Sequence, residues 1–142
     1  MTNNRYGKGR VGLFPSALGA LSLTFRFPDT RRLILNAARL LAGPPVSVEG
    51  GDEFIETTLR RGADGGVVVH LLNWAMGERP SSSAIPMGPL RVRVRLPPGA
   101  RRPPFAHLCW AGRKVRCSST GDGVSFVVPG ITEYEMVRLP GD

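Results

Sequence analysis

The sequence predicts a mainly β protein, an antiparallel β-sandwich of about seven or eight strands preceded by one strand and one helix. Three observations support this fold class. A helical pattern ends at Pro44-Pro45, and short apolar runs separated by glycine- and proline-rich turns fill the rest of the chain. Leu90–Leu96 (LRVRVRL) alternates strictly between apolar and arginine residues, as expected of a strand with one buried face.

The composition is that of an ordinary globular protein. The chain has 142 residues, of which 42% are hydrophobic and 21% charged, enough for one domain and marginal for two. No apolar run approaches the ~20 residues of a membrane span, and the N-terminal MTNNRYGKGR lacks the apolar core of a signal peptide. We therefore expect a cytoplasmic protein with no membrane partner, unless Met1 is an artificial boundary inside a longer gene.

Residues 1–45 are expected to form a remnant of an α/β domain, because one strand and one helix are too little for a βαβ unit. Val11–Phe14 fits a short buried strand. Ser16–Pro28 is irregular and predicts a loop, or a strand around Leu23–Phe27. Gly7–Gly9 is interpreted as a tight turn into the strand rather than a phosphate loop, since no helix follows it directly.

A helix is predicted from Asp29 or Thr30, either of which is a suitable N-cap, to about Ala42. Gly43 then fits the C′ position that ends many helices. The apolar residues along one face of this helix follow a helical spacing and are expected to be buried: Leu33, Ile34, Ala37, Leu40 and Leu41.

The proline pair Pro44-Pro45 forbids continuation of the helix and is the expected boundary between residues 1–45 and residues 46–142. Ala63–Gly66 is a strong turn signal, and Met76–Pro89, with three prolines and three serines, predicts a long loop. The strands expected after the boundary are Val46–Glu49, Glu53–Arg61, Val67–Trp74, Leu90–Leu96, Phe105–Trp110, Lys114–Cys117, Val124–Val128 and Glu133–Leu139.

The sequence predicts no metal site, no cofactor and no disulfide. Cys109 and Cys117 would not sit opposite one another in the hairpin that contains them, so a disulfide is not favoured. Two cysteines without a neighbouring histidine pair do not make a zinc site.

No catalytic constellation is evident among the residues. His70 has no nucleophile or carboxylate near it in the chain, so we interpret it as a structural histidine satisfied by neighbouring loops. Asn73 is expected to cap a turn or bond a loop backbone. Glycoside hydrolysis needs two carboxylates held across a cleft, and the glutamates of the β region are interpreted instead as solvated surface groups: Glu53, Glu56, Glu133 and Glu135.

Two sets of residues are candidate binding residues. Trp74 and Trp110 predict either a sugar-stacking platform or core tryptophans of a small sandwich. Arg91, Arg93 and Arg95 could grip phosphates or an acidic partner, or they could protect an edge strand by charge. The net charge of +8 comes mostly from arginines spread along the chain rather than from a basic run, so a nucleic-acid partner is not favoured.

At the level of whole motifs the chain resembles the C-terminal end of bacterial β-galactosidase-like glycoside hydrolases with a trimerisation domain. The runs that carry the resemblance are RYGKGRVGLFP, the helix ending LILNAARLLAGPP, FIETTLRRGADGGVVVHLLNW, IPMGPLRVRVRLPPG and the closing EYEMVRL. In that family a TIM barrel with the catalytic carboxylates comes first, an amidotransferase-like α/β domain follows, and a small β-sandwich closes the chain.

The resemblance implies a non-catalytic accessory or assembly module, a fragment that lacks the barrel and hydrolyses nothing alone. Its expected partner is the rest of the parent hydrolase or a second copy of itself, because the apolar stripe of the predicted helix needs covering. Two alternatives stay open. One is a free-standing carbohydrate-binding sandwich that uses Trp74 or Trp110, and the other is a basic nucleic-acid-binding module that uses Arg91, Arg93 and Arg95.

Overall fold

A computed structural model describes residues 1–25, 27–41, 43–51, 54–75 and 84–141 of the chain. The chain forms two compact units, Met1–Pro44 and Pro45–Asp142, and each is described by itself. In the part of the chain that the structure describes, no helix is long and apolar enough to cross a bilayer.

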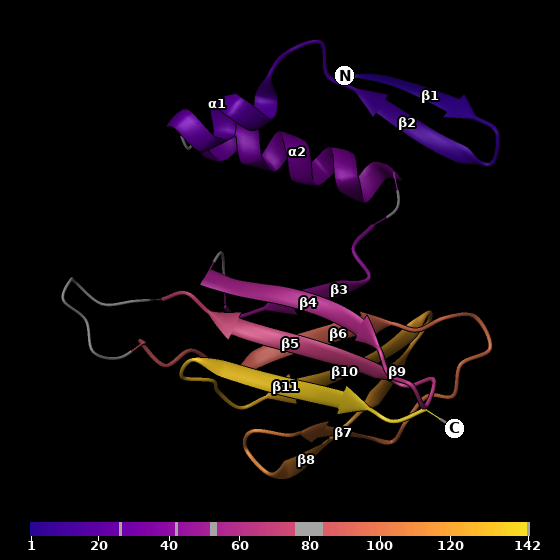
Figure 1. Ribbon diagram of the computed structural model, residues 1–142, viewed down its shortest axis with the longest axis vertical. Coiled ribbons are helices and arrows are strands. Elements are labelled where there is room, and N and C mark those ends of the chain that lie inside the picture. Colours follow the sequence, from indigo (N-terminus) through magenta and orange to yellow (C-terminus); the bar gives the residue numbers. More distant parts are fainter. Residues whose placement is uncertain (26, 42, 52–53, 76–83, 142) are drawn as a thin grey trace. The chain divides into compact units, whose positions relative to one another are not determined.

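The first unit contains a β-hairpin and two helices (Figure 1). Strands β1 (Thr2–Tyr6) and β2 (Gly9–Leu13) pair antiparallel, and Gly7 supplies the positive φ of the turn between them, at +57°. The strand expected at Val11–Phe14 is therefore the second arm of a hairpin. Helix α1 (Leu18–Phe25) replaces the loop or strand expected between the hairpin and the next helix. Its leucines lack a clear helical spacing, so the sequence pattern does not predict this helix.

Helix α2 (Pro28–Leu41) begins slightly before the predicted N-cap. The backbone N–H groups of Thr30 and Arg31 donate to the carbonyl oxygen of Phe27, which places Pro28 at the first helical position, where its missing N–H costs nothing. The predicted last residue, Ala42, lies outside the described residues. Gly43 takes the left-handed conformation predicted for the residue that ends the helix, with φ +66°, and its N–H donates to the carbonyl of Ala38, five residues back.

The apolar stripe of α2 is only partly buried, contrary to expectation. Ala37 is buried and Leu41 is half-buried. Leu33, Ile34 and Leu40 keep 46%, 36% and 53% of their surface exposed. The hairpin and α1 together are too small to cover a fourteen-residue amphipathic helix. The hairpin and α1 therefore leave much of the stripe uncovered within the first unit.

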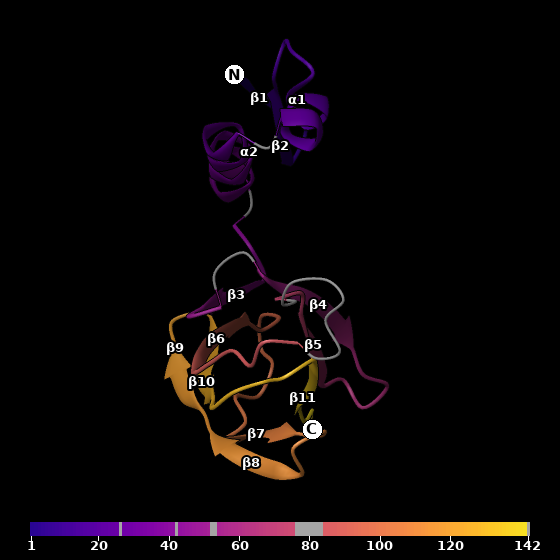
Figure 2. The same ribbon diagram turned by 90° about the vertical axis from the view of Figure 1, so that its left-hand side faces the viewer.

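The second unit is an antiparallel β-sandwich, which confirms the predicted fold class. Figure 2 shows its two sheets facing one another. One sheet has the strand order β3-β6-β10-β9 and the other β4-β5-β11-β7-β8. The strands of the first sheet are β3 (Val46–Glu49), β6 (Leu90–Arg95), β10 (Gly123–Val128) and β9 (Ser118–Thr120).

The strands of the second sheet are β4 (Ile55–Arg61), β5 (Val67–Asn73), β11 (Tyr134–Leu139), β7 (Phe105–Leu108) and β8 (Arg113–Arg116). Residues 45–141 that the structure describes thus hold nine strands. The additional one, β9, has three residues and was not among the predicted strands. Glu53, at the predicted start of β4, and most of the predicted loop Met76–Pro89 lie outside the described residues.

The core of the sandwich is a layer of aliphatic side chains between the two sheets. Leu90, Val92 and Val94 of β6 are fully buried, as the alternation LRVRVRL predicts, and they face Val69 and Leu71 of the other sheet. Complete burial of each such side chain stabilises the fold by roughly 1.5–3 kcal/mol. The layer continues through Leu108, Val124, Val128, Val137 and Leu139.

Asn73 is a buried polar side chain at the end of β5 and is 6% exposed. Its Nδ2 donates to the carbonyl oxygens of Ile85 and Thr132, both at 2.7 Å, and its Oδ1 accepts from the N–H of Ala75 at 2.9 Å. The predicted role of bonding a loop backbone is confirmed. One amide thereby joins the chain after β5, the chain before β6 and the chain before β11.

We expect Asn73→Ala to lower the free energy of unfolding by about 2–4 kcal/mol, because it leaves buried carbonyl and N–H groups without partners. Urea denaturation followed by circular dichroism measures this change. Ser47→Ala, at an exposed position of β3, is the matched control and should change stability by less than about 0.5 kcal/mol. Equal stabilities of the two variants would contradict the bridging role of Asn73.

Candidate functional site

The outer face of the five-stranded sheet carries a row of polar and aromatic side chains. Strand alternation points Glu56 of β4, His70 and Leu72 of β5, and Tyr134 of β11 away from the core. Glu56 lies opposite Leu72, and Leu72 lies opposite Tyr134. These side chains therefore meet at one end of the sheet.

The two tryptophans flank this row, and neither belongs to the core. Trp74 follows β5 directly, is 55% exposed, and donates its indole N–H to Glu56 Oε2 at 2.8 Å. Trp110 lies in the turn between β7 and β8 and is 79% exposed. Its ring meets Tyr134 edge-on, with the centroids 6.3 Å apart and the planes at 80°. Of the two alternatives for the tryptophans, the core interpretation is wrong.

His70 pairs with a tyrosine of the same sheet rather than with a loop. Its Nδ1 lies 2.5 Å from the hydroxyl of Tyr134, and the two rings stack with their centroids 6.0 Å apart. His70 is directly opposite Met136 on β11, so Tyr134 is its diagonal neighbour, within reach of long side chains. A contact across 64 residues of sequence cannot be read from local spacing.

Glu135 is buried, so its interpretation as a solvated surface carboxylate was wrong. It is 2% exposed, and its two carboxyl oxygens accept the backbone N–H groups of Trp110 at 2.8 Å, Ala111 at 3.1 Å and Met136 at 3.0 Å. It shares the inward positions of β11 with Val137 and Leu139. That alternation was visible in EYEMVRL and could have predicted its burial. Glu133, just before β11, is exposed as expected.

We expect Glu135→Ala to destabilise the second unit by about 2–4 kcal/mol and to free the turn that carries Trp110, because three backbone N–H groups lose their acceptor. In a Trp74→Phe background Trp110 is the single tryptophan, so its fluorescence anisotropy reports the mobility of the turn. The anisotropy should fall. Glu133→Ala is the control, and an equal change in that variant would contradict the role of Glu135.

The arginine ladder Arg91, Arg93 and Arg95 is a paired outer face of a central strand. Asp122 accepts from Arg93 at 2.9 Å and from Arg95 at 3.0 Å, and Arg91 approaches Glu49 at 3.9 Å. Strand β6 lies between β3 and β10, so the interpretation of a charge-protected edge strand was wrong. One charged edge strand is β8, which carries Arg113, Lys114 and Arg116.

The two arginines hold the pKa of Asp122 below its ordinary value, first through the hydrogen bond from Arg93 and then through that from Arg95. A carboxylate whose pKa is lowered by folding stabilises the fold above the pKa of the unfolded chain, about 3.9. That stabilisation is lost as the pH falls through the lowered value.

We therefore expect Asp122→Asn to reduce the loss of stability between pH 6 and about pH 3. Urea midpoints of wild type and variant at both pH values measure the difference. Glu133→Gln, which removes an exposed carboxylate without such partners in the described contacts, should behave like wild type. A pH dependence unchanged by Asp122→Asn would contradict the stabilising role of the Asp122 pairs.

The second unit contains both cysteines of the chain. Cys109 and Cys117 are both free thiols, and burial raises the pKa of Cys117 to about 11. A thiol with so high a pKa is a poor nucleophile at neutral pH. Within the described ranges, no three His, Cys, Asp or Glu side chains group as metal ligands.

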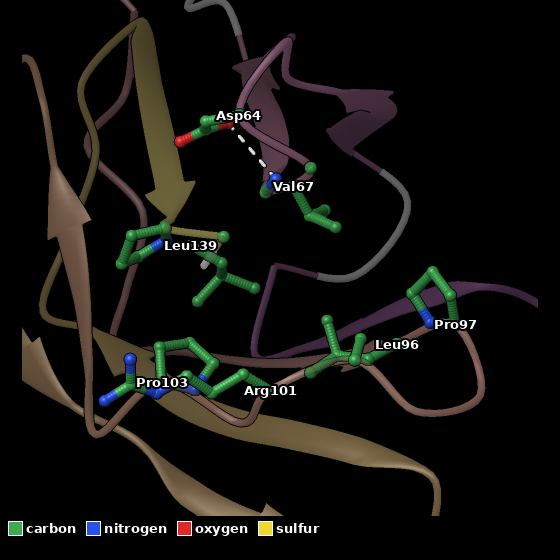
Figure 3. Close-up of a pocket in the computed structure, with 12 residues that line it drawn as sticks. Asp64, Val67, Leu96, Pro97, Arg101, Pro103 and Leu139 are labelled. Carbon is green, nitrogen blue, oxygen red and sulfur yellow. Dashed lines mark hydrogen bonds between the residues drawn. The ribbon is translucent and has the colours of Figure 1, made fainter.

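A small hollow of about 130 Å³ opens where the β4–β5 turn meets the end of β11 (Figure 3). Val67, Leu96 and Leu139 line it, and the carboxylate of Asp64 above it is already engaged by the Gly66 N–H at 3.1 Å and by Arg138 at 2.7 Å. These bonds hold the pKa of Asp64 below its ordinary value, the Arg138 bond most strongly. The Asp64 carboxylate beside the hollow is therefore already paired within the protein.

Comparison with known proteins identifies a shared fold. No family model and no curated protein matches the chain. Among solved structures, α-L-fucosidase isoenzyme 2 from Paenibacillus thiaminolyticus superimposes with a TM-score of 0.72 at 22% identity, over 88% of this chain and 20% of that one. The chain thus spans about a fifth of the length of that protein. The match exceeds the second unit alone, so it includes residues of both units.

Proposed function

We propose that this chain is a non-catalytic accessory or assembly module of a glycoside hydrolase. The likeness to one fifth of an α-L-fucosidase, extending over both units, is the observation that carries the proposal. A module of this kind accounts for a fold that covers a small part of a much longer hydrolase. The resemblance of the sequence to the end of β-galactosidase-like hydrolases supports the same role independently.

The carboxylates of the second unit also favour a non-catalytic role. Glycosidases hold two carboxyl groups across a cleft, one to protonate the leaving oxygen and one to attack or to activate water. Glu135 is instead enclosed by backbone N–H groups, and Asp64 and Asp122 are paired with arginines. Glu56 bonds the indole of Trp74 on an open sheet face. These contacts give the four acids a structural role.

The first unit supports the assembly part of the proposal. Leu33, Ile34 and Leu40 present an apolar stripe that a soluble chain would cover with another surface. The surface proposed is the rest of the parent hydrolase or a second copy of this chain, as in hydrolases whose α/β domain mediates trimerisation. The parent protein would then resemble the β-galactosidase-like family, with the barrel preceding residues 1–45.

The size of the native polypeptide tests the proposal, together with the activity of the isolated chain. An antibody raised against the second unit should detect, in source cells, a band tens of kDa heavier than 15.3 kDa, since a barrel of ~250 residues would precede it. The purified chain should not hydrolyse aryl α-L-fucosides or aryl β-D-galactosides. A native band at 15.3 kDa, or turnover by the folded chain alone, would contradict the proposal.

A further inference from the structure

The two tryptophans of the chain lie on one face and at one end of the same sheet. Trp74 is bonded to Glu56 on β4, and Trp110 contacts Tyr134 on β11 from the turn after β7. In the order β5-β11-β7, the segments that carry the two tryptophans are two strand spacings apart, about 10 Å. Two exposed indoles therefore bracket a short strip of surface.

Trp110 is held in place before any ligand arrives. The buried Glu135 accepts the N–H groups of Trp110 and Ala111, and Tyr134 supports the edge of the indole ring. An aromatic ring fixed in this way loses little conformational entropy when a ligand stacks on it. A tryptophan that is 79% exposed and yet ordered by a buried carboxyl group has no role in the core.

Polar groups that can donate and accept hydrogen bonds lie beside the indoles. The His70 imidazole, the Tyr134 hydroxyl and the Glu56 carboxylate all sit on the outer face, with Thr58 opposite His70. A pyranose ring has an apolar face that suits indole and hydroxyl groups that suit such partners. We propose that this surface, bounded by Trp74 and Trp110, binds an uncharged oligosaccharide.

The charge of the row, unlike that of the outer face at β8, where Lys114 and Arg116 lie, supports this choice of ligand over a polyanion. The row between the tryptophans carries Glu56 and none of the arginines of the sheet. Arg60 and Arg138 both lie opposite Val68, farther along the face. Nucleic-acid platforms instead interleave cations with the stacking rings. The site goes beyond the accessory role proposed above and does not depend on it.

Binding can be followed directly, because the chain has only these two tryptophans. The full chain, labelled at its amino groups, is first applied to an array of neutral oligosaccharides ending in fucose, galactose, glucose, mannose or xylose. The best array sugar is then titrated against unlabelled protein while tryptophan emission is recorded. Trp74→Phe isolates the signal of Trp110, and Trp110→Phe isolates that of Trp74. A saturable change is expected in both.

Affinity should fall roughly two- to tenfold in Trp110→Ala and in Trp74→Ala, because a stacked aromatic contact is lost. Trp110→Phe, which keeps a ring, should lose less. Phe105→Ala is the matched control: it removes an aromatic of similar exposure, 47%, from the other end of the same face, and should bind like wild type. Far-ultraviolet circular dichroism verifies that each variant is folded.

Three results would overturn the proposal. The first is that no neutral sugar on the array binds the folded wild-type chain. The second is saturable binding whose affinity is unchanged in both Trp→Ala variants, and the third is an equal loss in Phe105→Ala. A native band at 15.3 kDa would count against the hydrolase module and leave this site standing, so the two proposals fail separately.

Discussion

The aliphatic layer between the two sheets positions every surface feature of the second unit. Val69, Leu71 and Val92 are completely buried, and side chains of both sheets interdigitate there. Because the side-chain period of a strand is two, a slip of one residue in β5 would turn Val69 outward and His70 inward. The apolar layer thus fixes the register, and the register sets which side chains share the outer face. The tryptophan-bounded surface is a consequence of core packing.

Two buried polar side chains complete the layer at the end where that surface lies. Asn73 ends β5 and Glu135 lies near the start of β11, and the register of these strands brings the two positions to the same end of the sheet. Each is satisfied by backbone groups: Asn73 by three loop segments and Glu135 by the turn of Trp110. A buried polar side chain with unmet hydrogen bonds destabilises the fold more than an apolar side chain would. Asn73 and Glu135 therefore favour the one loop conformation that satisfies their hydrogen bonds. Loop geometry at this end is therefore determined from inside the sandwich.

Sequence patterns predicted the strands well where one face is buried. LRVRVRL alternates strictly between apolar and arginine residues, whereas VVVHLLN is a nearly continuous apolar run, and both proved to be central strands. Patterns failed for α1, whose residues lack periodicity, and for β9, which is too short to show any. The central position of β6 in its sheet also could not be predicted from the sequence, because strand order depends on pairings between residues distant in sequence.

Only part of the candidate site could be predicted from the sequence. Trp74 and Trp110 stood out by residue type, although their exposure did not. Tyr134 and His70, which lie near the tryptophans on the surface, contact each other across 64 residues of sequence. The burial of Glu135 depends on hydrogen bonds from a turn of another hairpin. The alternation of β11 was the single local signal of that burial.

The last strand of the chain lies in the middle of its sheet. β11 pairs with β5 on one side and with β7 on the other, so the order β4-β5-β11-β7-β8 closes only through the final residues. On the ribosome the hairpin β4–β5 and the hairpin β7–β8 emerge first, each with an unpaired inner edge. The two hairpins cannot form a continuous sheet until β11 is synthesised. A polypeptide released before then would keep two unpaired strand edges that can pair with other chains. Synthesis of β11 is thus the step that makes the five-stranded sheet continuous.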